Sequence, residues 1–340
     1  MRSRPNVSDV ARKAGVSAAT VSRAFNAPSA VRLELREKVL KAARALGYSP
    51  NPAAKALRMQ RTHMVGAIIP TLNYDIFARM INAFQTRLST SGTMVMLTAT
   101  GFDNRVLEAP ARQLVERGAE ALLVVGEVMD EGMIAFIRER QIPVVTTYSF
   151  SSNGPYPSIG FDNYAAAREL TEHIIGLGHK HIAMIAAQTA GNDRQTARVA
   201  AFKATAAKKG LARTACVIER VHAIVDGAEA MRSLREAYPA TTAVICNSDV
   251  LAFGALSECK RLGLKVPRDI SITGFDDQEL AALVEPPLTT VAVPAAEMGE
   301  RAANILLAAI NGDAASAGPF AGVRLETRLV VRGSTGPARS

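Results

Sequence analysis

Arg23 is the residue near the start of the chain best suited to recognise a partner. It lies on the outward face of a short predicted helix that begins after Ser17, and Ala18, Ala19 and Ser22 share that face. A guanidinium can donate two parallel hydrogen bonds to the edge of a guanine base, and an alanine methyl can pack on the methyl group of a thymine. This face is therefore suited to contact with the base edges of DNA.

A first helix must position that second helix. Its apolar residues recur at the i, i+3, i+4 and i+7 spacing of one helical face, as Val7, Val10, Ala11 and Ala14. Asn6 is a suitable N-cap, and Gly15 can end the helix in the left-handed conformation without steric cost. A helix, a glycine turn and a second helix with an exposed arginine together indicate a helix-turn-helix.

The positive charge of the chain is concentrated around this motif. The whole chain has 40 Lys and Arg against 31 Asp and Glu. Residues 1–61 alone have 13 against 3, so residues 62–340 have 27 against 28 and are nearly neutral. A basic helical face is often only a solvated surface, but that alternative does not explain why one segment alone is polarised. Attraction to DNA phosphates does explain it.

The residues after this motif predict a third helix and a short conditional one. The buried face of the third helix is marked by Leu35, Val39, Ala42 and Leu46. Gly47 ends it, while Arg32 stands at its start in place of a capping side chain. Asn51 and Pro52 then open a helix over residues 51–58. Because isolated helices under ~12 residues are marginal in water, we expect this linker helix to need support from outside.

Length and composition limit the class of protein. A chain of 340 residues suits two or three domains, and 48% hydrophobic with 21% charged residues is typical of a folded protein with a large core. Cys216, Cys246 and Cys259 form no disulfide framework or CxxC pattern, which favours a reducing cytoplasm. No apolar run approaches the ~18 residues that span a bilayer, and the first ten residues lack an apolar signal region. We therefore expect a cytoplasmic protein without a membrane partner.

From residue 65 the sequence alternates between short apolar runs and amphipathic stretches. The apolar runs fall at residues 65–70, 94–99, 121–126, 142–147, 181–187, 215–220, 242–247 and 270–275. The stretches with helical periodicity fall at residues 77–89, 106–117, 133–140, 164–176, 196–209, 228–238 and 249–262. Apolar strands separated by helices predict parallel sheets covered on both faces. Two such units in tandem predict a cleft between them, lined by loops at the carboxyl ends of the strands.

Several motifs are similar to those of one known family. They are VSDVARKAGVSAATVSRAFN, GYSPNPAAKAL, IGFDN, NSDVLAFGAL and GFDDQEL with PPLTTV. Over residues 6–332 the chain resembles the lactose-repressor/galactose-repressor (LacI/GalR) family. The resemblance implies an all-α helix-turn-helix headpiece and an α/β periplasmic-binding-protein-like core of two doubly wound parallel-sheet subdomains.

The resemblance also implies how the domains divide. The expected parts are a DNA-binding domain at 1–50, a hinge helix and linker at 51–61, a core at 62–332 and a disordered tail at 333–340. The chain is expected to cross between subdomains three times. One subdomain would then hold residues 62–160 plus 291–320, and the other 161–290 plus 321–332, where the alternating segment GVRLETRLVVRGST predicts an edge strand.

Site residues follow from the resemblance, position by position. The expected DNA contacts are Ser17, Ala18, Ala19, Thr20, Ser22, Arg23 and Asn26 in the headpiece, with Ala54 and Leu57 in the hinge. Leu57 matches a residue that wedges into the minor groove in the family. The expected effector contacts are Asn73, Phe77, Phe161, Asn192, Arg194, Arg198, His222, Ser248 and Asp276.

The implied partners are double-stranded operator DNA, a small polar metabolite (a sugar, a sugar acid or similar) as effector and a second copy of the chain. A homodimer is expected, with a dimer of dimers as the alternative. A tetramer held by a coiled coil is not expected, because the sequence shows no long heptad repeat after residue 333. Neither a cofactor nor a metal is expected. The function implied is that of a transcriptional regulator, in particular a repressor, whose effector acts by ordering or disordering the hinge helices.

Arg198 and Asp276 fit the chemistry of a polar ligand best, because a guanidinium and a carboxylate can hold neighbouring hydroxyl groups or a ligand carboxylate. A structural ion pair across the cleft is the alternative. His222 is as readily interpreted as a loop histidine without a role. Ser248 stands where the family often has an aspartate, which leaves the hydrogen-bonding pattern toward the ligand open.

Other functions find less support in the sequence. His179 and His181 lack a third metal ligand at useful spacing, and the adjacent Asp276 and Asp277 should point to opposite sides of the chain. An enzyme on a doubly wound fold would need a nucleophile or a cofactor fingerprint, and no GxGxxG, GxxxxGK, GxSxG or HExxH motif is present. A periplasmic solute-binding protein would need an export signal. We therefore expect no enzymatic activity.

Overall fold

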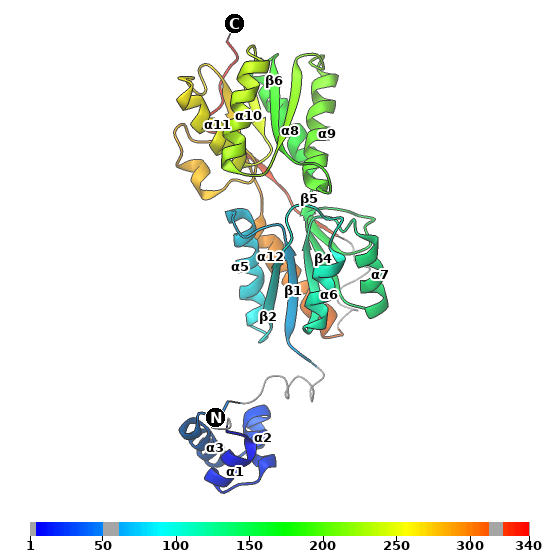
Figure 1. Ribbon diagram of the computed structural model, residues 1–340, viewed down its shortest axis with the longest axis vertical. Coiled ribbons are helices and arrows are strands. Elements are labelled where there is room, and N and C mark those ends of the chain that lie inside the picture. The colour runs from blue at the N-terminus through cyan, green and yellow to red at the C-terminus, as the bar shows by residue number, and fades with distance from the viewer. Residues whose placement is uncertain (1–4, 50–60, 313–321, 340) are drawn as a thin grey trace. The chain divides into compact units, whose positions relative to one another are not determined.

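The computed structural model describes residues 5–49, 61–312 and 322–339. The chain divides into two units, Met1–Thr62 and His63–Ser340, which Figure 1 shows in ribbon form. We call them the headpiece and the core. The predicted hinge helix, including Ala54 and Leu57, lies outside the described residues.

Residues 5–49 of the headpiece form three α-helices and a short 3-10 helix. Their bounds are α1 Val7–Ala14, α2 Ala18–Asn26, η1 Pro28–Ala30 and α3 Leu33–Leu46. Asn6 caps α1 through a capping box with Asp9, and Gly15 ends it at φ 60°. Both caps were predicted from residue type, and the absence of a side-chain cap at Arg32 is also confirmed.

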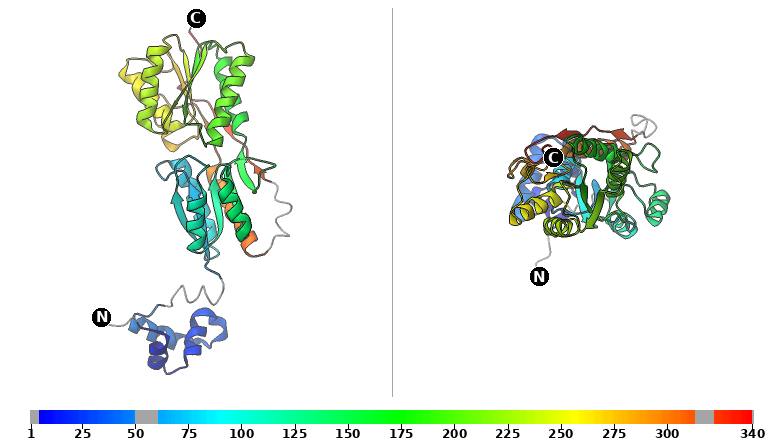
Figure 2. Two further views of the ribbon diagram at one scale, coloured as in Figure 1. Left: turned by 45° about the vertical axis from the view of Figure 1, so that its right-hand side comes forward. Right: turned by 90° about the horizontal axis from the view of Figure 1, so that it is seen from above.

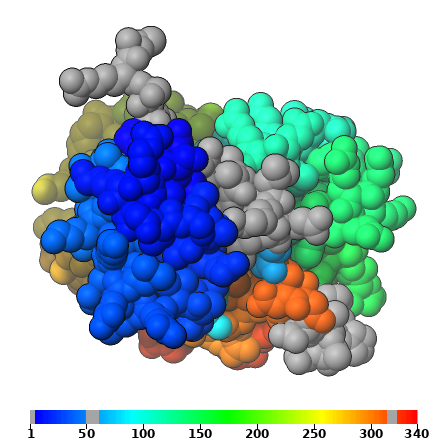
Figure 3. Space-filling view, turned by 90° about the horizontal axis from the view of Figure 1, so that it is seen from below, coloured from blue at the N-terminus to red at the C-terminus, as the bar shows by residue number. Residues whose placement is uncertain are grey.

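A small apolar core holds these helices together. It is built from one face of each helix, with Val10, Val21 and Val39 fully buried at its centre. Phe25 and Tyr48 pack at its edge, with their rings 5.9 Å apart. Figure 3 shows the headpiece in space-filling form, in blue. Packing of short amphipathic helices, rather than helix propensity, stabilises such a unit.

The first lobe of the core is a six-stranded parallel sheet with four helices. Its strands are β1 Met64–Ile69, β2 Met94–Ala99, β3 Ala119–Val125, β4 Val144–Ser149, β5 Ser158–Phe161 and β11 Val323–Arg324. They are arranged in the order β11-β5-β4-β3-β1-β2. Its helices are α5 Asp75–Ser89, α6 Glu108–Glu116, α7 Glu131–Arg140 and α12 Ala295–Ile310. The chain thus returns to this lobe after building the second one. The expectation that residues 321–332 belong to the second subdomain was wrong for β11, which pairs with β5 in this sheet.

The helices of the first lobe cover both faces of its sheet, as Figure 1 shows. Along β3, Leu122 and Val124 pack in the cluster under α6 and α7. The alternate residues Leu123 and Val125 pack in the cluster under α5 and α12. A strand that buries both of its faces must be apolar throughout, which is the pattern that predicted this strand.

The second lobe repeats this plan with a four-stranded parallel sheet. Its strands are β6 Ile182–Ala187, β7 Ala215–Arg220, β8 Ala243–Cys246 and β9 Ser271–Thr273, in the order β7-β6-β8-β9. Its helices are α8 Asn163–Gly176, α9 Asp193–Lys208, α10 Ile224–Ala237, α11 Asp249–Arg261 and the 3-10 helix η2 Glu279–Ala282. Both lobes are seen edge-on in the left view of Figure 2. A two-stranded antiparallel pair, β10 Thr290–Ala292 with β12 Arg328–Val330, completes the core.

Helix α12 was not predicted from the sequence. It packs closely on α5, since a Cβ on Gly299 would lie 2.1 Å from the carbonyl oxygen of Met80. Its buried face includes Met298, Ala302 and Leu306, and it starts without a capping side chain. The segment therefore lacks the cap signal that marked the headpiece helices.

The prediction of a disordered tail after residue 332 was wrong. Ser334 is fully buried, and its hydroxyl donates to the carbonyl oxygen of Ile272 at 2.6 Å. Its Oγ also accepts a hydrogen bond from the backbone N–H of Thr289 at 2.8 Å. Further along, the N–H of Ala338 donates to the carbonyl oxygen of Leu177 at 2.9 Å. Backbone and hydroxyl bonds of this kind hold a polar segment in place, and hydrophobic pattern does not reveal them.

Candidate DNA interface and effector site

Helix α2 presents the predicted base-reading face to solvent. Ser17 caps the helix, because its Oγ accepts from the backbone N–H of Thr20 at 3.1 Å and lies 2.9 Å from the Thr20 hydroxyl. Ala18, Ala19 and Arg23 are exposed on the helix that follows. The cap therefore fixes the start of α2 and leaves the Arg23 guanidinium free of the apolar core.

Ser22 and Asn26 interact with each other on the same helix. The Asn26 side-chain amide donates to the carbonyl oxygen of Ser22 at 2.6 Å and lies 3.3 Å from its hydroxyl. A contact from Asn26 to DNA would have to coexist with these bonds or replace them. Arg23 carries the long cationic side chain of this face, so it is the side chain best able to reach a base edge.

In the core, a small cavity lies where the carboxyl ends of both sheets meet. Seven predicted effector residues line it: Phe77, Asn192, Arg194, Arg198, His222, Ser248 and Asp276. They come from segments that follow β1, β6, β7, β8 and β9 in the chain. The cavity volume is about 30 Å³, roughly the space that one water molecule occupies in the liquid. A metabolite can enter only if the lobes move apart, and we call the space between them the cleft.

Arg198 is buried at the base of the cleft. Its Nε donates to the Asn163 side-chain oxygen at 2.9 Å, and its Nη1 donates to the carbonyl oxygen of Asn247 at 2.8 Å. Its guanidinium lies 3.6 Å from the ring centroid of Phe275. Asn163 in turn donates to the carbonyl oxygen of Tyr148 in β4, at 2.9 Å. This chain of bonds links the second lobe to the first and orients the guanidinium, although burial lowers its pKa to about 10.

Asp276 follows β9 in an unusual backbone conformation. Its φ is 116°, a region that residues with a side chain rarely adopt. Burial raises the pKa of its carboxyl group to about 7, although Arg198, Arg79 and Arg194 act in the opposite direction. Its neighbour Asp277 turns away and pairs with Arg332 at 2.7 Å, as the sequence predicted for adjacent residues on a strand end. A strained, buried carboxylate costs stability, which is typical of binding sites.

This cost predicts a pH-dependent effect of Asp276→Asn. A carboxyl group whose pKa is raised by folding favours the folded state below its unfolded pKa, and loses that contribution as the pH rises to about 7. The asparagine variant does not bear this cost, so it should be more stable than the parent at pH 8. At pH 5 the difference in stability between the two proteins should be smaller. The gain at pH 8 could reach about 4 kcal/mol, at ~1.4 kcal/mol per pKa unit.

Urea unfolding of both proteins at pH 5 and pH 8 measures this difference. Asp277→Asn is the matched control, because it removes a carboxylate that is 22% exposed and paired with Arg332. That control should give no gain at either pH. Parallel stability curves for the parent and Asp276→Asn would contradict the assignment of a buried, destabilised carboxyl group.

His222 joins the two lobes through its backbone and its ring. The Tyr74 hydroxyl of the first lobe donates to its carbonyl oxygen, and its ring packs against Tyr74 and Phe102 at centroid distances of 4.8 and 4.9 Å. Its Nε2 lies 2.7 Å from the Ser248 hydroxyl. Burial and the charges of Arg198 and Arg194 lower the pKa of the ring to about 3. His222 is therefore a neutral wall of the cleft, and not a loop histidine without contacts.

Further hydrogen bonds close the cleft from its edges. The backbone N–H of Asn104 donates to the carbonyl oxygen of Gly191 at 2.8 Å, and the Ser149 hydroxyl donates to the Asp193 carboxylate. The two lobes therefore meet through polar contacts rather than through one apolar interface. Contacts of this kind can be exchanged for water when the lobes separate.

Two predicted effector residues lie elsewhere, and four others were missed. Asn73 is exposed in the loop before α5. Phe161 is buried behind Arg198, with its ring 6.0 Å from that guanidinium. The cavity residues that sequence reasoning did not find are Ile76, Phe102, Tyr148 and Gln195. Gln195 lies beside predicted residues on α9, so the position of Arg194 and Arg198 at the start of a helix could have indicated it.

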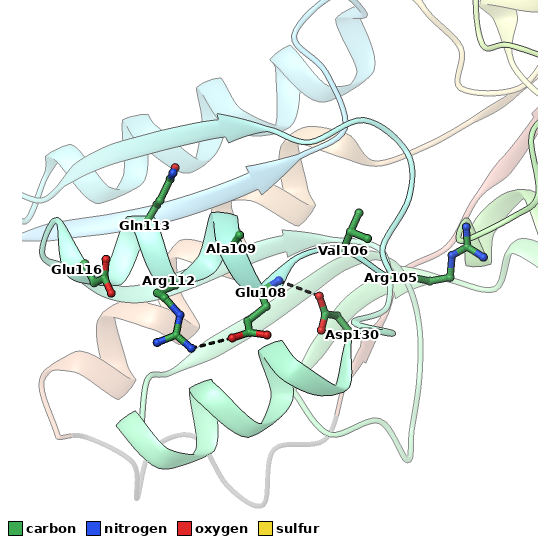
Figure 4. Close-up of a pocket in the computed structure, with 8 residues that line it drawn as sticks. All are labelled: Arg105, Val106, Glu108, Ala109, Arg112, Gln113, Glu116 and Asp130. Carbon is green, nitrogen blue, oxygen red and sulfur yellow. Dashed lines mark hydrogen bonds and ion pairs between the residues drawn. The ribbon is translucent and has the colours of Figure 1, made fainter.

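A second hollow lies on the first lobe, between α6 and the start of α7 (Figure 4). Arg112 pairs there with Glu108 at 2.7 Å, and the Asp130 carboxylate accepts from the backbone N–H of Glu108 at 2.8 Å. These charges are satisfied by each other and by the helix start. The cleft, where several buried polar atoms lack partners, is the stronger candidate for ligand binding.

Residues 5–49, 61–312 and 322–339 show neither a metal-binding cluster nor a membrane-spanning helix. Within those residues, no group of three or more His, Cys, Asp or Glu side chains could hold a metal ion. None of the described helices is both long and apolar enough to cross a membrane. The three cysteines are present as free thiols.

Comparisons with known proteins agree with this arrangement. Residues 6–51 match the family model described as bacterial regulatory proteins, lacI family, and residues 171–335 match a periplasmic binding protein-like domain. The chain is 32% identical over 312 residues to the HTH-type transcriptional regulator GntR of Escherichia coli K12, covering 92% of this chain and 94% of that protein. It is 30% identical over 333 residues to the repressor CytR of the same organism, covering 96% and 95%. The crystal structure of the lac repressor dimer bound to operator and an anti-inducer is similar with a TM-score of 0.85, at 26% identity over 98% of this chain and 100% of that one.

Proposed function

The chain belongs to the lacI family of bacterial regulatory proteins, and from that premise we propose that it is a cytoplasmic repressor whose operator affinity is set by a metabolite in the cleft. The observation that carries this proposal is the combination of two sites in one chain. An exposed arginine stands on a capped recognition helix, and a separate unit holds a cleft with buried, incompletely paired polar groups. Its relatives are regulators, and we propose no enzymatic activity.

On the DNA side, we assign base contacts to Ala18, Ala19 and Arg23. Ser17, Thr20, Ser22 and Asn26 are assigned to the sugar-phosphate backbone. Ala18 and Ala19 offer only methyl groups, so discrimination among bases within each half-site depends strongly on Arg23. For the hinge we keep the proposal that Leu57, with Ala54 beside it, enters the minor groove of the operator, as wedge residues do.

On the ligand side, the carboxyl ends of two sheets provide the site. Both lobes contribute residues to the cavity, so a bound metabolite would change how readily the lobes separate. The linker that leads to the headpiece joins the core just before β1, in the first lobe. A change in the lobes therefore has a covalent route to the hinge, and ordering of the hinge helices is the switch that we propose.

We further propose that two chains associate through an apolar surface of the second lobe. This apolar surface is formed by five exposed side chains, Val221, Ile224, Val225, Leu280 and Leu283, with Leu283 73% exposed. They lie just before and at the start of α10, and within and directly after η2. Large apolar side chains that stay exposed in this way are typical of a protein interface. A dimer would also present two recognition helices to the two halves of an operator.

The dimer proposal predicts that Val225→Glu weakens self-association. Burying a glutamate in each half of a symmetric apolar interface is costly, so the dimer dissociation constant should rise at least about tenfold. Operator affinity should fall with it, because a single headpiece reaches one half-site only. Sedimentation analysis over a concentration series measures the effect. Val331→Glu is the control, since Val331 is similarly exposed, at 57%, outside the apolar surface, and unchanged association of Val225→Glu would reject this interface.

The overall proposal is tested with DNA selected from a random pool by the full-length chain. We expect a pseudo-palindromic operator and a set of small polar compounds that both stabilise the chain and change its affinity for that operator. Binding without sequence preference would reject operator recognition. Compounds that stabilise the chain without changing operator affinity would reject metabolite control.

A further inference from the structure

One buried cation in the cleft lacks a hydrogen-bond partner. Arg194 is the second residue of α9, is 4% exposed and lines the cavity. Within the described part of the chain, its Nη1 and Nη2 atoms are both buried without a hydrogen bond. Burial of a guanidinium costs its hydration free energy, and that cost is offset only where an anion or a hydrogen-bond acceptor contacts the group.

Arg194 forms an ion pair with Asp193 that is too long to be a hydrogen bond. Asp193 lies 3.9 Å from Nη1, beyond hydrogen-bond distance, and its other carboxylate oxygen accepts from the Ser149 hydroxyl. The guanidinium lies against the backbone of Gly126, where an added Cβ would be 2.2 Å from Nη1. Arg194 thus reaches from the second lobe to the end of β3 in the first, with its planar fork of donors unused.

Unused acceptors surround the same cavity. The side-chain oxygen of Gln195 and the Nδ1 atom of His222 are buried there without partners among the described residues, and Nδ1 is an acceptor when the ring proton is on Nε2. The Asp276 carboxyl group adds a third acceptor on the cavity wall. Hydroxyl groups are donors that match such acceptors, whereas an apolar ligand would leave all of them unsatisfied.

The charges around the cavity leave a surplus of at most about one positive charge, once the Asp193 carboxylate beside Arg194 is counted. Arg194 and Arg198 are cations, while the pKa of Asp276 near 7 leaves that group only partly ionised at neutral pH. The His222 ring is neutral, because its pKa is lowered to about 3. A ligand with a single negative charge balances this set while Asp276 is protonated, whereas the two charges of a phosphate ester would exceed it in either state of Asp276.

We propose that the effector is a small hydroxylated carboxylate, of the sugar-acid class, whose carboxylate group is held by Arg194 and whose hydroxyl groups are held by Gln195, His222 and Asp276. This inference rests on the proposed function, since it assumes that the cleft binds the effector. It goes further in naming the chemical class of the effector and the residue that selects it. Arg194 is the specificity-determining residue because a neutral sugar brings no carboxylate to its guanidinium.

The test compares compounds of one carbon skeleton that are neutral, carry a carboxylate or carry a phosphate ester. The full-length chain is titrated calorimetrically with aldonates and hexuronates, with the corresponding neutral aldoses and with hexose 6-phosphates, at one ionic strength. At least one acid is expected to bind at least about tenfold more tightly than its neutral counterpart and than the phosphate ester. Arg194→Gln should weaken acid binding about 10- to 100-fold while leaving the affinity for neutral sugars unchanged.

Two controls separate binding from folding. Arg168→Gln replaces an exposed arginine of α8 and should leave every affinity unchanged. In the absence of ligand, Arg194→Gln should melt at the same temperature as the parent or higher, because it removes a buried cation whose Nη1 and Nη2 atoms lack a hydrogen bond among the described residues. A lower melting temperature would instead identify Arg194 as a structural residue and overturn the inference.

The remaining outcomes distinguish this inference from the proposed function. Tighter binding of a neutral sugar or of a phosphate ester, with a change in operator affinity, would overturn the sugar-acid class and leave metabolite control standing. Binding of none of these compounds at millimolar concentration would also overturn the class. If an extract of cell metabolites then failed to change operator affinity, the proposed function would fail as well.

Discussion

Replacing Arg198 with alanine is expected to abolish the effector response while operator binding persists. Arg198 offers a guanidinium to the cleft that is already oriented by Asn163, Asn247 and the ring of Phe275. Hydrogen bonds to charged groups contribute about 1.5–3 kcal/mol each, and a preoriented donor loses little entropy on binding. Loss of two such bonds should reduce effector affinity by about 100-fold or more.

The same variant interrupts the connection between the lobes. Without Arg198, the Asn163 side chain loses the donor that orients it, and its own bond to the carbonyl oxygen of Tyr148 is no longer supported. Calorimetry with a stabilising compound and anisotropy with labelled operator measure the two properties separately. Arg198→Lys keeps the charge and should recover little, because an ammonium cannot reproduce the fork of a guanidinium. Wild-type effector affinity in both variants would contradict the assignment.

Replacing Arg23 with alanine is expected to remove most base discrimination at one position of each operator half-site. Each bidentate contact between arginine and guanine contributes about 1–3 kcal/mol of discrimination. In a dimer the loss occurs twice, so specific affinity should fall by about 2–6 kcal/mol if the two half-sites contribute independently. Selection from a random DNA pool, repeated with the variant, shows the position at which the base preference is lost.

A basic residue elsewhere on the headpiece provides the matched control for Arg23. Arg44 is exposed on α3, outside the recognition helix. Any loss of affinity in Arg44→Ala should be the same for all DNA sequences. The number of counterions released on binding, given by the slope of log affinity against log salt concentration, should fall by at most about one per headpiece. An unchanged base preference in Arg23→Ala would show that another residue reads the half-site.

Local chemistry in the sequence was enough to predict the headpiece. Asn6 and Gly15 begin and end α1, and Ser17 begins α2, as their residue types indicated. Caps are local, so the pattern carries the information without knowledge of the rest of the fold. The apolar strands of the core were predicted for a similar reason, since a strand buried on both faces has no polar positions to obscure it.

Features that depend on contacts distant in sequence were not predicted from pattern. Helix α12 begins after Pro294 without a side-chain cap, and its place against α5 depends on the close approach at Gly299. The tail is held by the Ser334 hydroxyl on β9. Tyr148 lines the cleft from β4, and Phe102 lines it from the loop after β2. The apolar pattern of these segments indicates that the side chains are buried, but not that they face the cleft. Long-range packing and buried hydroxyl bonds decide each of these cases.

The charge balance of the site also required the structure. The sequence placed Arg194, Arg198 and Asp276 near one cleft through the family resemblance, but it could not show which of them are paired. The structure shows Arg198 bonded to Asn163 and Asn247, and Arg194 without a hydrogen bond from Nη1 or Nη2. That difference separates a positioned binding group from a group that still needs a partner.

The most direct test of metabolite control is the operator affinity of the full-length chain, measured by fluorescence anisotropy across a titration with a compound that stabilises it. We expect a change of about 5- to 150-fold at saturation, the range of a coupling free energy of about 1–3 kcal/mol. With Arg198→Ala we expect no change over the same concentrations. Operator affinity that stays constant for the parent chain while the cleft fills with ligand would contradict metabolite control.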